Sequence, residues 1–343
     1  MANSLMEIAK NDPILVFGAG GGGDVIGALH IYNKLKSMGA ETYLGALVWE
    51  RYVVDPHPGP IPLIAFFNVD PISETAAIAE GKSRAYRYGH EIIPQVIRVA
   101  GALNEKVILL DGSRGAEGLA LGLTSVVDHL SVKTVIGVDV GGDLLAKGKE
   151  EGLWSPLADS LSLYAINRVE GEKIIAIHAA GADGELPADL VYNYISEIAR
   201  DNGLITSVGL DKNDVSLYEK IKNNVITEAS RIPIEAFEGY YGKIIIRNGT
   251  REVSVSPCTT ITFLLDASVV YNHSEIARVV AGSRHIGEAS NKLNEKCIYT
   301  EYNLEKDIAA LLETGMKLEE IDITKVRSDG LARLKHRCRS NTS

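Results

Sequence analysis

Short apolar segments rich in β-branched residues alternate with longer amphipathic segments over most of the chain. This alternation is typical of βαβ units, in which parallel strands are joined by crossover helices. The expected strands are residues 14–18, 42–48, 63–67, 106–110, 134–138, 173–178 and, with a weaker pattern, 204–208. The alternation therefore predicts an α/β, Rossmann-like fold with a mainly parallel sheet and helices on both faces.

Helical periodicity fills most of the gaps between these strands. The expected helices are residues 25–38, 84–103, 115–130, 156–169, 187–202 and 213–229. Gly39 follows the first helix, where glycine suits a left-handed C-cap. Pro156 and Pro187 stand at first-turn positions, where proline loses no hydrogen bond. Residues 1–230 are therefore predicted to form one α/β ligand-binding core.

The sequence changes character after about residue 231. Two β-rich runs in KIIIRNGTREVSVS meet at Asn248-Gly249, a dipeptide that favours a tight hairpin turn. One further helix is expected over residues 303–312. Residues 231–328 are predicted to form an α+β extension packed on the core, and the basic residues 329–343 a disordered tail.

Charge and cysteine content narrow the class of protein. The 343 residues include 45 acidic and 35 basic side chains, which gives a formal net charge of -10. This charge opposes non-specific binding to nucleic acids and to anionic membranes. Cys258, Cys297 and Cys338 lie far apart in sequence and form no Cys-x-x-Cys pair, so neither a disulfide framework nor a zinc ribbon is expected.

Neither a secretion signal nor a membrane span is recognisable. The start, MANSLMEIAKNDP, has no basic segment followed by an apolar one, and no apolar run approaches the roughly 20 residues of a spanning helix. We therefore expect a soluble, cytoplasmic protein that keeps its N-terminus. Its expected partner is a small molecule, and homo-oligomerisation is left open.

Glycine and charged side chains follow most of the expected strands. In open α/β sheets, ligands bind outside the carboxyl ends of the strands. The segments at these ends are residues 18–24, 49–51, 111–115, 139–143 and 178–185. Several such loops on one edge of the sheet predict a polar pocket there.

The first of these loops contains four consecutive glycines before an acid. Gly18-x-Gly20-x-x-Gly23 fits the dinucleotide fingerprint between a strand and a helix, and Glu50 is placed to hold a ribose hydroxyl. Backbone N–H groups of Gly20, Gly21, Gly22 and Gly23 are candidate phosphate donors. The plainer alternative is a tight turn in which Asp24 is the helix N-cap.

A divalent cation would explain why an acid stands beside a phosphate loop. Asp139 and Asp143 flank two glycines in one loop, and with Asp24 they form a plausible magnesium site, completed by phosphate oxygens and water. The alternative is ordinary turn chemistry, because Asp-Gly and Gly-Asp pairs are common in turns.

Four further side chains are candidates at this edge. Arg51 and Arg114 would clamp an anion, and Asp111 would serve as the general base. His178 ends a strand and is a second candidate base or ligand. Each also has a structural interpretation: a surface ion pair between Arg114 and Asp111, and a buried histidine that only forms hydrogen bonds.

Three stretches, GAGGGGDVIGAL, LVWERYVVDPHPGPIP and IGVDVGGD, occur in this order. Their combination resembles an uncharacterised family of mainly archaeal and some bacterial proteins, domain-of-unknown-function family 1152. The resemblance spans most of the chain and is weakest after about residue 300. It implies the α/β core and marks residues 20–24, 49–51, 58–60 and 139–143 as matching positions, but it brings no established reaction.

Three functional hypotheses follow. The first is an enzyme of small-molecule metabolism that binds a phosphorylated or nucleotide-like ligand at the strand ends and carries out Mg²⁺-assisted phosphoryl transfer or hydrolysis. The second is an NAD(P)- or flavin-binding oxidoreductase that uses Gly18 to Gly23 as a fingerprint. The third is a nucleotide or metabolite sensor without turnover.

Overall fold

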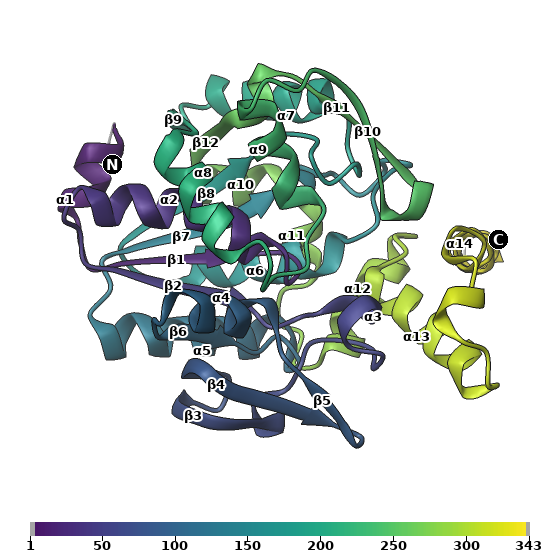
Figure 1. Cartoon of the computed structure of the whole chain (residues 1–343). Coiled ribbons are helices and arrows are strands. Elements are labelled where there is room, and N and C mark those ends of the chain that lie inside the picture. The colour runs from purple at the N-terminus through teal and green to yellow at the C-terminus, as the bar shows by residue number, and fades with distance from the viewer. Residues whose placement is uncertain (1–3, 341–343) are drawn as a thin grey trace.

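The computed structural model describes residues 4–340, which are organised around a large mixed sheet (Figure 1). Within these residues the sheet has ten strands, in the order β3-β4-β6-β2-β1-β7-β8-β12-β9, with β5 paired to β4. The strands are β1 (Ile14–Gly18), β2 (Thr42–Leu47), β3 (Phe66–Ser73), β4 (Ala76–Arg87), β5 (His90–Ile92), β6 (Val107–Leu110), β7 (Thr134–Val140), β8 (Glu172–His178), β9 (Leu204–Gly209) and β12 (Ile261–Asp266).

The middle of the sheet is parallel. β6, β2, β1, β7 and β8 are paired neighbours that run in one direction. Antiparallel strands extend the sheet on both sides, β4 and β3 beyond β6, and β12 and β9 beyond β8. The chain proceeds from β1 to one side through β2 and β6, and to the other side through β7 and β8. The loops after β1 and β7 therefore diverge, and ligands of open α/β sheets bind at such a point.

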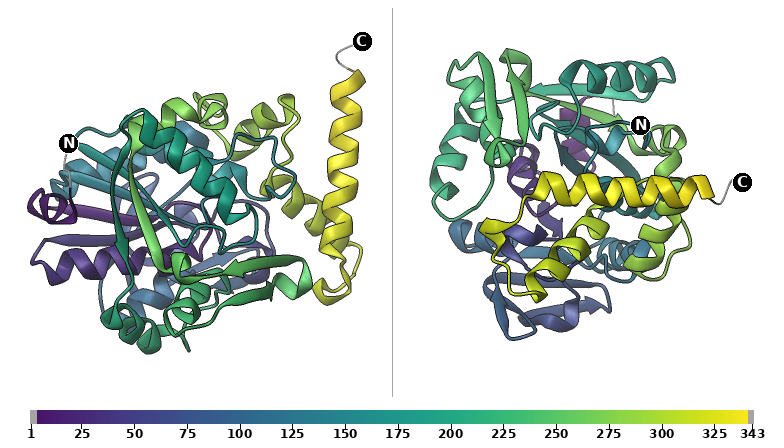
Figure 2. Two further views of the ribbon diagram at one scale, coloured as in Figure 1. Left: turned by 90° about the horizontal axis from the view of Figure 1, so that it is seen from above. Right: turned by 90° about the vertical axis from the view of Figure 1, so that its right-hand side faces the viewer.

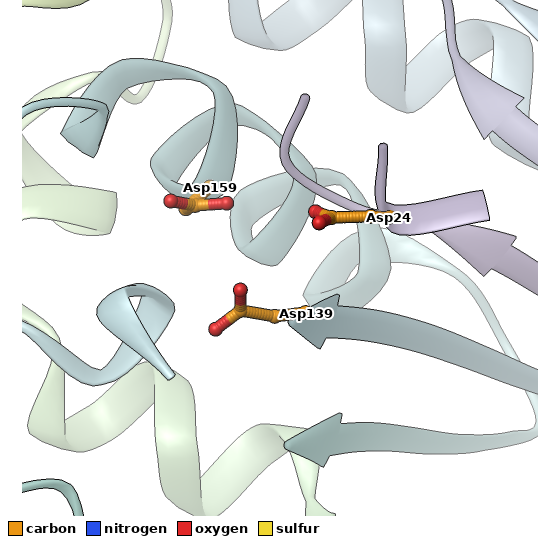
Figure 3. A group of neighbouring side chains, drawn as sticks. All are labelled: Asp24, Asp139 and Asp159. Carbon is orange, nitrogen blue, oxygen red and sulfur yellow. The ribbon is translucent and has the colours of Figure 1, made fainter. Parts of the chain in front are cut away.

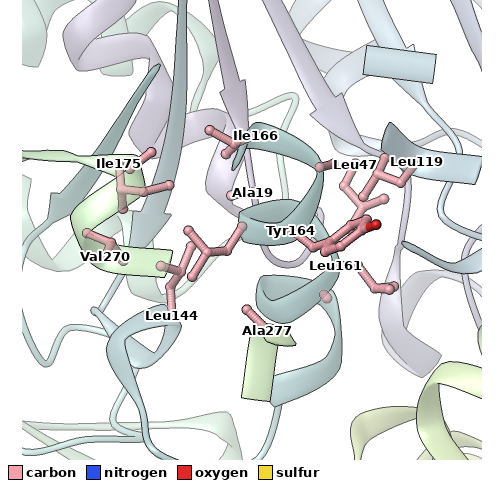
Figure 4. Close-up of a cluster of buried hydrophobic side chains, with 14 of the residues drawn as sticks. Ala19, Leu47, Leu119, Leu144, Leu161, Tyr164, Ile166, Ile175, Val270 and Ala277 are labelled. Carbon is pink, nitrogen blue, oxygen red and sulfur yellow. The ribbon is translucent and has the colours of Figure 1, made fainter. Parts of the chain in front are cut away.

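Helices cover both faces of the sheet. Leu15 and Phe17 of β1 pack into one apolar cluster, which includes α5, α6 and α10 (Figure 4), whereas Ile14 and Val16 pack into a second cluster with α1, α2 and α4. The helices of the core are α1 (Leu5–Lys10), α2 (Asp24–Ser37), α3 (Arg51–Val54), α4 (Gln95–Leu103), α5 (Gly115–Leu130), α6 (Pro156–Arg168), α7 (Ala188–Arg200), α8 (Lys212–Ile221), α10 (Ala267–His273), α11 (Glu275–Val279) and α12 (Ile286–Glu295). Within residues 4–340, no helix combines the length and the apolar character that crossing a membrane requires.

One segment of the core differs from the sequence-based expectation. Residues 84–94 were expected to begin a helix, but they belong to β4 and β5, and α4 begins only at Gln95. The buried residues of β4 in this region, Ala79, Ser83 and Ala85, are small and give a weak apolar alternation. Small residues are needed because α4 lies close to the strand: a Cβ added to Gly81 would lie 2.9 Å from the backbone nitrogen of Gly101.

Smaller differences occur elsewhere. Of the expected strand at residues 63–67, Leu63–Ala65 forms the 3₁₀ helix η1 and only the end belongs to β3. The helix expected over residues 213–229 ends with α8 at Ile221. β9 was expected in a mainly parallel sheet, but its partner β12 runs antiparallel to it. β3 and β9 lie at the two edges of the sheet, where the βαβ pattern no longer applies.

The C-terminal third adds two units to this core. β10 (Gly242–Ile246) and β11 (Arg251–Val255) form a separate antiparallel pair across η4 (Arg247–Gly249), and they pack with η3 (Ala229–Arg231) and α9 (Ile232–Phe237). The second unit consists of α13 (Glu301–Glu313), η6 (Leu318–Glu320) and α14 (Ile323–Ser340). Two further 3₁₀ helices are η2 (Asp143–Leu145), which follows β7, and η5 (Pro257–Thr260), which precedes β12. α14 lies at one side of the molecule beside α13 (Figure 2).

The end of the chain is more ordered than its composition suggests. Residues 329–340, for which a disordered tail was expected, form most of α14, and residues 341–343 lie outside the described residues. Tyr299, Leu304 and Leu334 join α13 and α14 in an apolar cluster. This apolar contact accounts for a helix in a segment whose charge alone indicated disorder.

The expectation for the cysteines is wrong for two of the three. Cys297, after α12, and Cys338, on α14, form a disulfide across 41 residues, whereas Cys258 is free and exposed. α13 and α14 contact each other, so the chain returns toward α12. Sequence spacing could not indicate that Cys297 and Cys338 lie close together, because this depends on how α13 and α14 pack against each other.

Candidate functional site

A cavity of about 830 Å³ lies at the carboxyl ends of the parallel strands, where the loops after β1 and β7 diverge. Gly20 to Asp24 line it, together with side chains that follow β2, β7 and β8. Residues 225–230, 247–251 and 318–324 complete the wall from outside the sheet, and in this set Arg247, Asn248, Arg251 and Thr227 supply polar groups. The cavity is therefore built from the core and closed by the C-terminal third.

Three aspartates from separate elements meet in this cavity (Figure 3). Asp24 begins α2, Asp139 lies near the end of β7, and Asp159 is in the first turn of α6. One carboxylate oxygen of each lies within 4.8 Å of the others. We call this set the first triad. Asp139 and Asp159 are buried, and Asp24 is half-buried.

The first triad is only partly satisfied by the protein. Asp24 accepts a hydrogen bond from the Gly20 N–H at 2.7 Å, and Asp139 accepts one from the Leu144 N–H at 3.1 Å. Oδ1 of Asp159 is buried and has no hydrogen-bond partner within residues 4–340. A buried charged oxygen without a partner is costly, so this atom indicates a missing cation or donor.

A second set of carboxylates adjoins the first. Asp143, Asp183 and Glu185 each place one oxygen within 4.8 Å of the others, and all three side chains are buried. We call this set the second triad. Glu185 is held firmly, because its oxygens accept from the Trp154 N–H at 2.6 Å and the Ser155 N–H at 3.0 Å.

Burial and mutual repulsion raise the pKa of most of these groups. Burial raises the pKa of Asp24 to about 7 and that of Asp183 to about 7. The pKa of Asp139 is raised by burial first, then by the charges of Asp24 and Asp183, so the two triads are electrostatically linked. Burial and neighbouring acids likewise raise the pKa of Asp143 and Asp159.

Glu185 is the exception among the six acids. Burial alone would raise its pKa, but Arg251, 3.1 Å away, and the hydrogen bond from Ser155 outweigh burial and lower it. Arg251 also stacks over the Trp154 ring, with the guanidinium 4.8 Å from the ring centre. Glu185 is thus ionised and held in place by the protein itself.

The glycines after β1 make room for carboxylates. A Cβ added to Gly20 would lie 2.5 Å from an oxygen of both Asp24 and Asp159, and one added to Gly18 would lie 2.5 Å from the Val25 nitrogen. Gly23 has a helical conformation and precedes α2, but Asp24 is not the N-cap: its carboxylate points back to the Gly20 N–H. Both the close approach and the tight turn therefore require small residues.

Gly22→Ala is expected to destabilise the protein, whereas Gly23→Ala is expected to be nearly neutral. The new Cβ at position 22 would lie 2.6 Å from Cδ of Glu50, a buried side chain that accepts from the Gln95 N–H at 2.9 Å. Overpacking of this kind costs about 1–3 kcal/mol. At position 23 the nearest atom, Oγ1 of Thr227, is 3.5 Å away. Urea unfolding of both variants measures the difference, and equal stabilities would contradict the packing argument.

Arg51 is fixed in a buried ion-pair network. Its guanidinium lies 3.4 Å from Glu301 and 3.8 Å from Glu305 of α13, and it stacks over the Trp49 ring at 4.5 Å from the centre. Glu301 in turn accepts from the first N–H groups of α6, those of Leu157 at 3.0 Å and Ala158 at 2.8 Å. Arg51 lines the cavity, and its Nη1 has no hydrogen-bond partner within the described residues.

Four of the sequence-based candidates, Gly18, Asp111, Arg114 and His178, do not line the cavity. Asp111 accepts from the Leu63 N–H at 2.9 Å and the Ser113 N–H at 2.7 Å, so it holds two loops together. Arg114 is half-exposed and pairs with the exposed Glu74. Both residues lie away from the cavity because β6 is two strands from β1, so the cavity gives no support to Asp111 as base or Arg114 as anion clamp.

His178 is also displaced from the cavity. It is buried at the end of β8, where Nδ1 lies 2.7 Å from the Thr262 hydroxyl of β12. Burial and then the nearby His30 ring lower the pKa of His178 to about 3. His178 thus forms a hydrogen bond with an antiparallel neighbour strand and does not line the cavity, and its role as a base stays a prediction.

The structure adds three acids to those predicted. Asp183 and Glu185 lie in the loop after β8, which was recognised as polar, but neither was assigned a role. Asp159 was missed altogether, because it lies within a helix rather than in a loop. Its signal is a lone acid among apolar neighbours in PLADSLSLYAI, on a helix whose first eleven residues are all buried.

The stability of the cation-free protein is expected to fall as the pH rises from 6.5 to 8. Burial raises the folded-state pKa of Asp24, Asp183, Glu50 and Glu305 to about 7, from the ordinary values of 3.8 for aspartate and 4.5 for glutamate. The folded state then binds more protons than the unfolded chain. The free energy of unfolding therefore falls by about 1 kcal/mol for each of these groups that gives up its proton in the folded state.

His178 has the opposite effect on stability, because its pKa is lowered in the folded state. This effect occurs mainly below pH 6.5, the pKa of histidine in the unfolded chain, where the unfolded chain takes up the proton. Melting curves in EDTA between pH 6.5 and 8 measure the effect. A melting temperature that is constant or rises across this window would contradict the raised carboxyl pKa values.

Comparison with known proteins gives a family but no activity. Neither a curated protein nor a solved structure matches the chain. A family model matches residues 15–309, so the cavity-lining residues 318–324 lie beyond the matched segment. The family is described as a protein of unknown function (DUF1152), and the chain belongs to it.

Proposed function

We propose that the cavity binds a divalent cation in the first triad and, through it, a phosphorylated or nucleotide-like small molecule, and that it catalyses phosphoryl transfer or hydrolysis. The observation that carries the proposal is the buried, unpartnered Oδ1 of Asp159, whose carboxylate lies together with those of Asp24 and Asp139. Carboxylate oxygens are the ligands that Mg²⁺ and Mn²⁺ prefer.

An anionic ligand needs a cation in this cavity. The six carboxylates of the two triads line it, and the guanidinium groups of Arg51 and Arg251 are already paired with glutamates. A phosphate placed beside Asp24 without a cation would be repelled. A divalent cation in the first triad removes this repulsion and gives the phosphate oxygens a ligand position.

The position in the sheet supports a phosphate-bearing ligand. The parallel strands β6-β2-β1-β7-β8 follow, in chain order of these five, the 3-2-1-4-5 order of Rossmann-like dinucleotide-binding sheets. The N–H groups of Gly21 and Gly23 donate to no protein acceptor within residues 4–340 and stand at the start of α2. A helix start with free N–H groups favours phosphate.

The same features favour one alternative, an NAD(P)- or flavin-binding oxidoreductase. Strand order, the glycine loop and an acid after β2 are shared with dinucleotide sites. Glu50, however, accepts from the Gln95 N–H and packs against Gly22, so a ribose hydroxyl would have to compete for it. Phosphoryl chemistry makes fuller use of the cavity, since it needs positioning and charge neutralisation more than a nucleophilic side chain.

A thermal-shift series tests the proposal. The protein is melted with Mg²⁺ or Mn²⁺, with nucleotides, dinucleotides or phosphorylated sugars, and with each combination. We expect a shift with the cation alone and a larger shift with cation plus phosphorylated ligand, because ligand at 100 times its Kd stabilises by about 2.7 kcal/mol.

The outcomes separate the candidate functions. Prolonged incubation of the best ligand with released phosphate as readout distinguishes an enzyme from a sensor, which binds without turnover. Binding of NADH or flavin that is indifferent to EDTA favours the oxidoreductase. The absence of any cation-induced shift would overturn the proposal.

A further inference from the structure

The second triad has the composition of a cation site of its own. Asp143 follows β7 and begins η2, while Asp183 and Glu185 lie in the loop after β8. Each of the three residues is at most 7% exposed, and one carboxylate oxygen of each lies within 4.8 Å of the others. None of these residues belongs to the first triad, so the two sets of ligand atoms are separate.

One oxygen of the second triad lacks any protein partner. Oδ1 of Asp183 is buried and accepts no hydrogen bond within residues 4–340. The surrounding backbone leaves space for this carboxylate: Gly141 has φ +117°, and a Cβ there would lie 2.8 Å from Cβ of Asp183. A buried carboxylate oxygen without a donor points to a bound cation.

The neighbouring groups orient the triad without neutralising it. The Ser155 hydroxyl lies 2.6 Å from Glu185 and 3.3 Å from Asp143, and so holds the two acids together. Arg251 forms an ion pair with Glu185 at 3.1 Å, whereas its hydrogen bond to Asp183 is to the backbone oxygen, also at 3.1 Å. Two of the three carboxylates thus have no ion-pair partner in the described part of the chain.

The charge of the cavity calls for more than one divalent cation. The six carboxylates of the two triads are accompanied by Arg251 as the only cation paired with a triad member within residues 4–340. When bound cations have displaced the protons, the six carboxylates carry six negative charges, of which one divalent cation and this arginine balance three. A second divalent cation brings the number to five, which leaves a site that an anionic ligand can approach.

We propose that Asp143, Asp183 and Glu185 bind a second divalent cation, so that the cavity holds a two-cation centre. The proposal deepens the proposed function, since the second cation lies in the same cavity as the first. All ligand atoms are carboxylate oxygens, which suits Mg²⁺ or Mn²⁺. Paired cations of this kind serve substrates with a phosphoryl group, whose oxygens they bind on both sides of the bond that breaks.

The test counts bound Mn²⁺ per chain. Free Mn²⁺ is measured by electron paramagnetic resonance during titration of the full-length protein with Mn²⁺ alone. We expect two ions per chain for the unchanged protein, one for Asp183→Asn and one for Asp159→Asn. Asp143→Asn serves as a second variant of the same triad, and Asp70→Asn, whose side chain is 79% exposed, is the control for loss of one negative charge.

Each result separates the two proposals. One ion in the unchanged protein that Asp159→Asn abolishes and Asp183→Asn retains would overturn the second site and leave the proposed function standing. One ion that Asp183→Asn abolishes and Asp159→Asn retains would support the second triad and overturn the first. No bound ion in the unchanged protein would overturn both. Circular dichroism of each variant shows that it is folded before ions are counted.

Discussion

Asp139→Asn is expected to lose most of the stabilisation that Mg²⁺ gives, while the cation-free variant is at least as stable as the unchanged protein. Asp139 is a buried member of the first triad, and burial together with Asp24 and Asp183 raises its pKa. Asparagine removes the cost of a charge there and keeps an oxygen for the Leu144 N–H. Loss of a residue that only supports a metal ligand lowers metal affinity roughly 10- to 100-fold, and loss of a ligand itself is expected to lower it at least as much.

Melting curves in EDTA and in millimolar Mg²⁺ check this prediction. A 100-fold loss of affinity removes about 2.7 kcal/mol of stabilisation at saturation. Asp111→Asn is the matched control, because Asp111 is also buried and accepts from backbone N–H groups but lies outside the cavity. An undiminished Mg²⁺ shift in Asp139→Asn, or an equal loss in Asp111→Asn, would place the cation elsewhere.

The parallel core could be predicted because its signal is local. β1 and α5 have the predicted bounds, residues 14–18 and 115–130, since buried parallel strands are continuous apolar runs and the helices between them are periodic. β4 was missed because close packing against α4 requires alanine, serine and glycine, which carry little periodic signal. The disulfide and α14 depend on contacts between distant segments, which no local pattern contains.

The candidate site was predictable in part for a similar reason. Asp24, Asp139 and Asp143 lie beside glycines at or after the ends of parallel strands, and all three line one cavity. They do not form one set, however: Asp143 belongs to the second triad. Asp159 was missed because the rule about strand ends concerns loops, whereas this acid enters the cavity from a helix.

The rule also assigned too much to the outer strand ends. Asp111 follows β6, two strands from β1, and His178 ends β8, the neighbour of β7. Both side chains connect segments: Asp111 joins the loop after β6 to η1, and His178 contacts β12. The strand alone does not separate binding groups from structural ones at this edge, because Asp183 and Glu185 follow the same strand as His178 and line the cavity.

Arg51→Ala is expected to destabilise the protein by about 3 kcal/mol, the low end for breaking a buried ion pair. The low end applies because the Arg51 side chain is 23% exposed. The change leaves Glu301 and Glu305 buried without their ion-pair partner. Glu301 holds the start of α6, which carries Asp159, so the effect is expected to reach the first triad.

The pH dependence of Arg51→Ala distinguishes lost charge pairing from lost packing. Burial raises the pKa of Glu305 to about 7 even though Arg51 opposes the shift, and without Arg51 the carboxyl group holds its proton still more tightly. Between pH 6 and 8 the folded variant then binds more protons than the folded unchanged protein, so the deficit is expected to shrink as the pH falls from 8 to 6. Arg114→Ala, which breaks a surface pair with Glu74, is the control and is expected to change stability by less than about 0.5 kcal/mol. A deficit in Arg51→Ala that is the same at pH 6 and pH 8 would mean that Arg51 acts through its contact with the Trp49 ring, and not through the two glutamates.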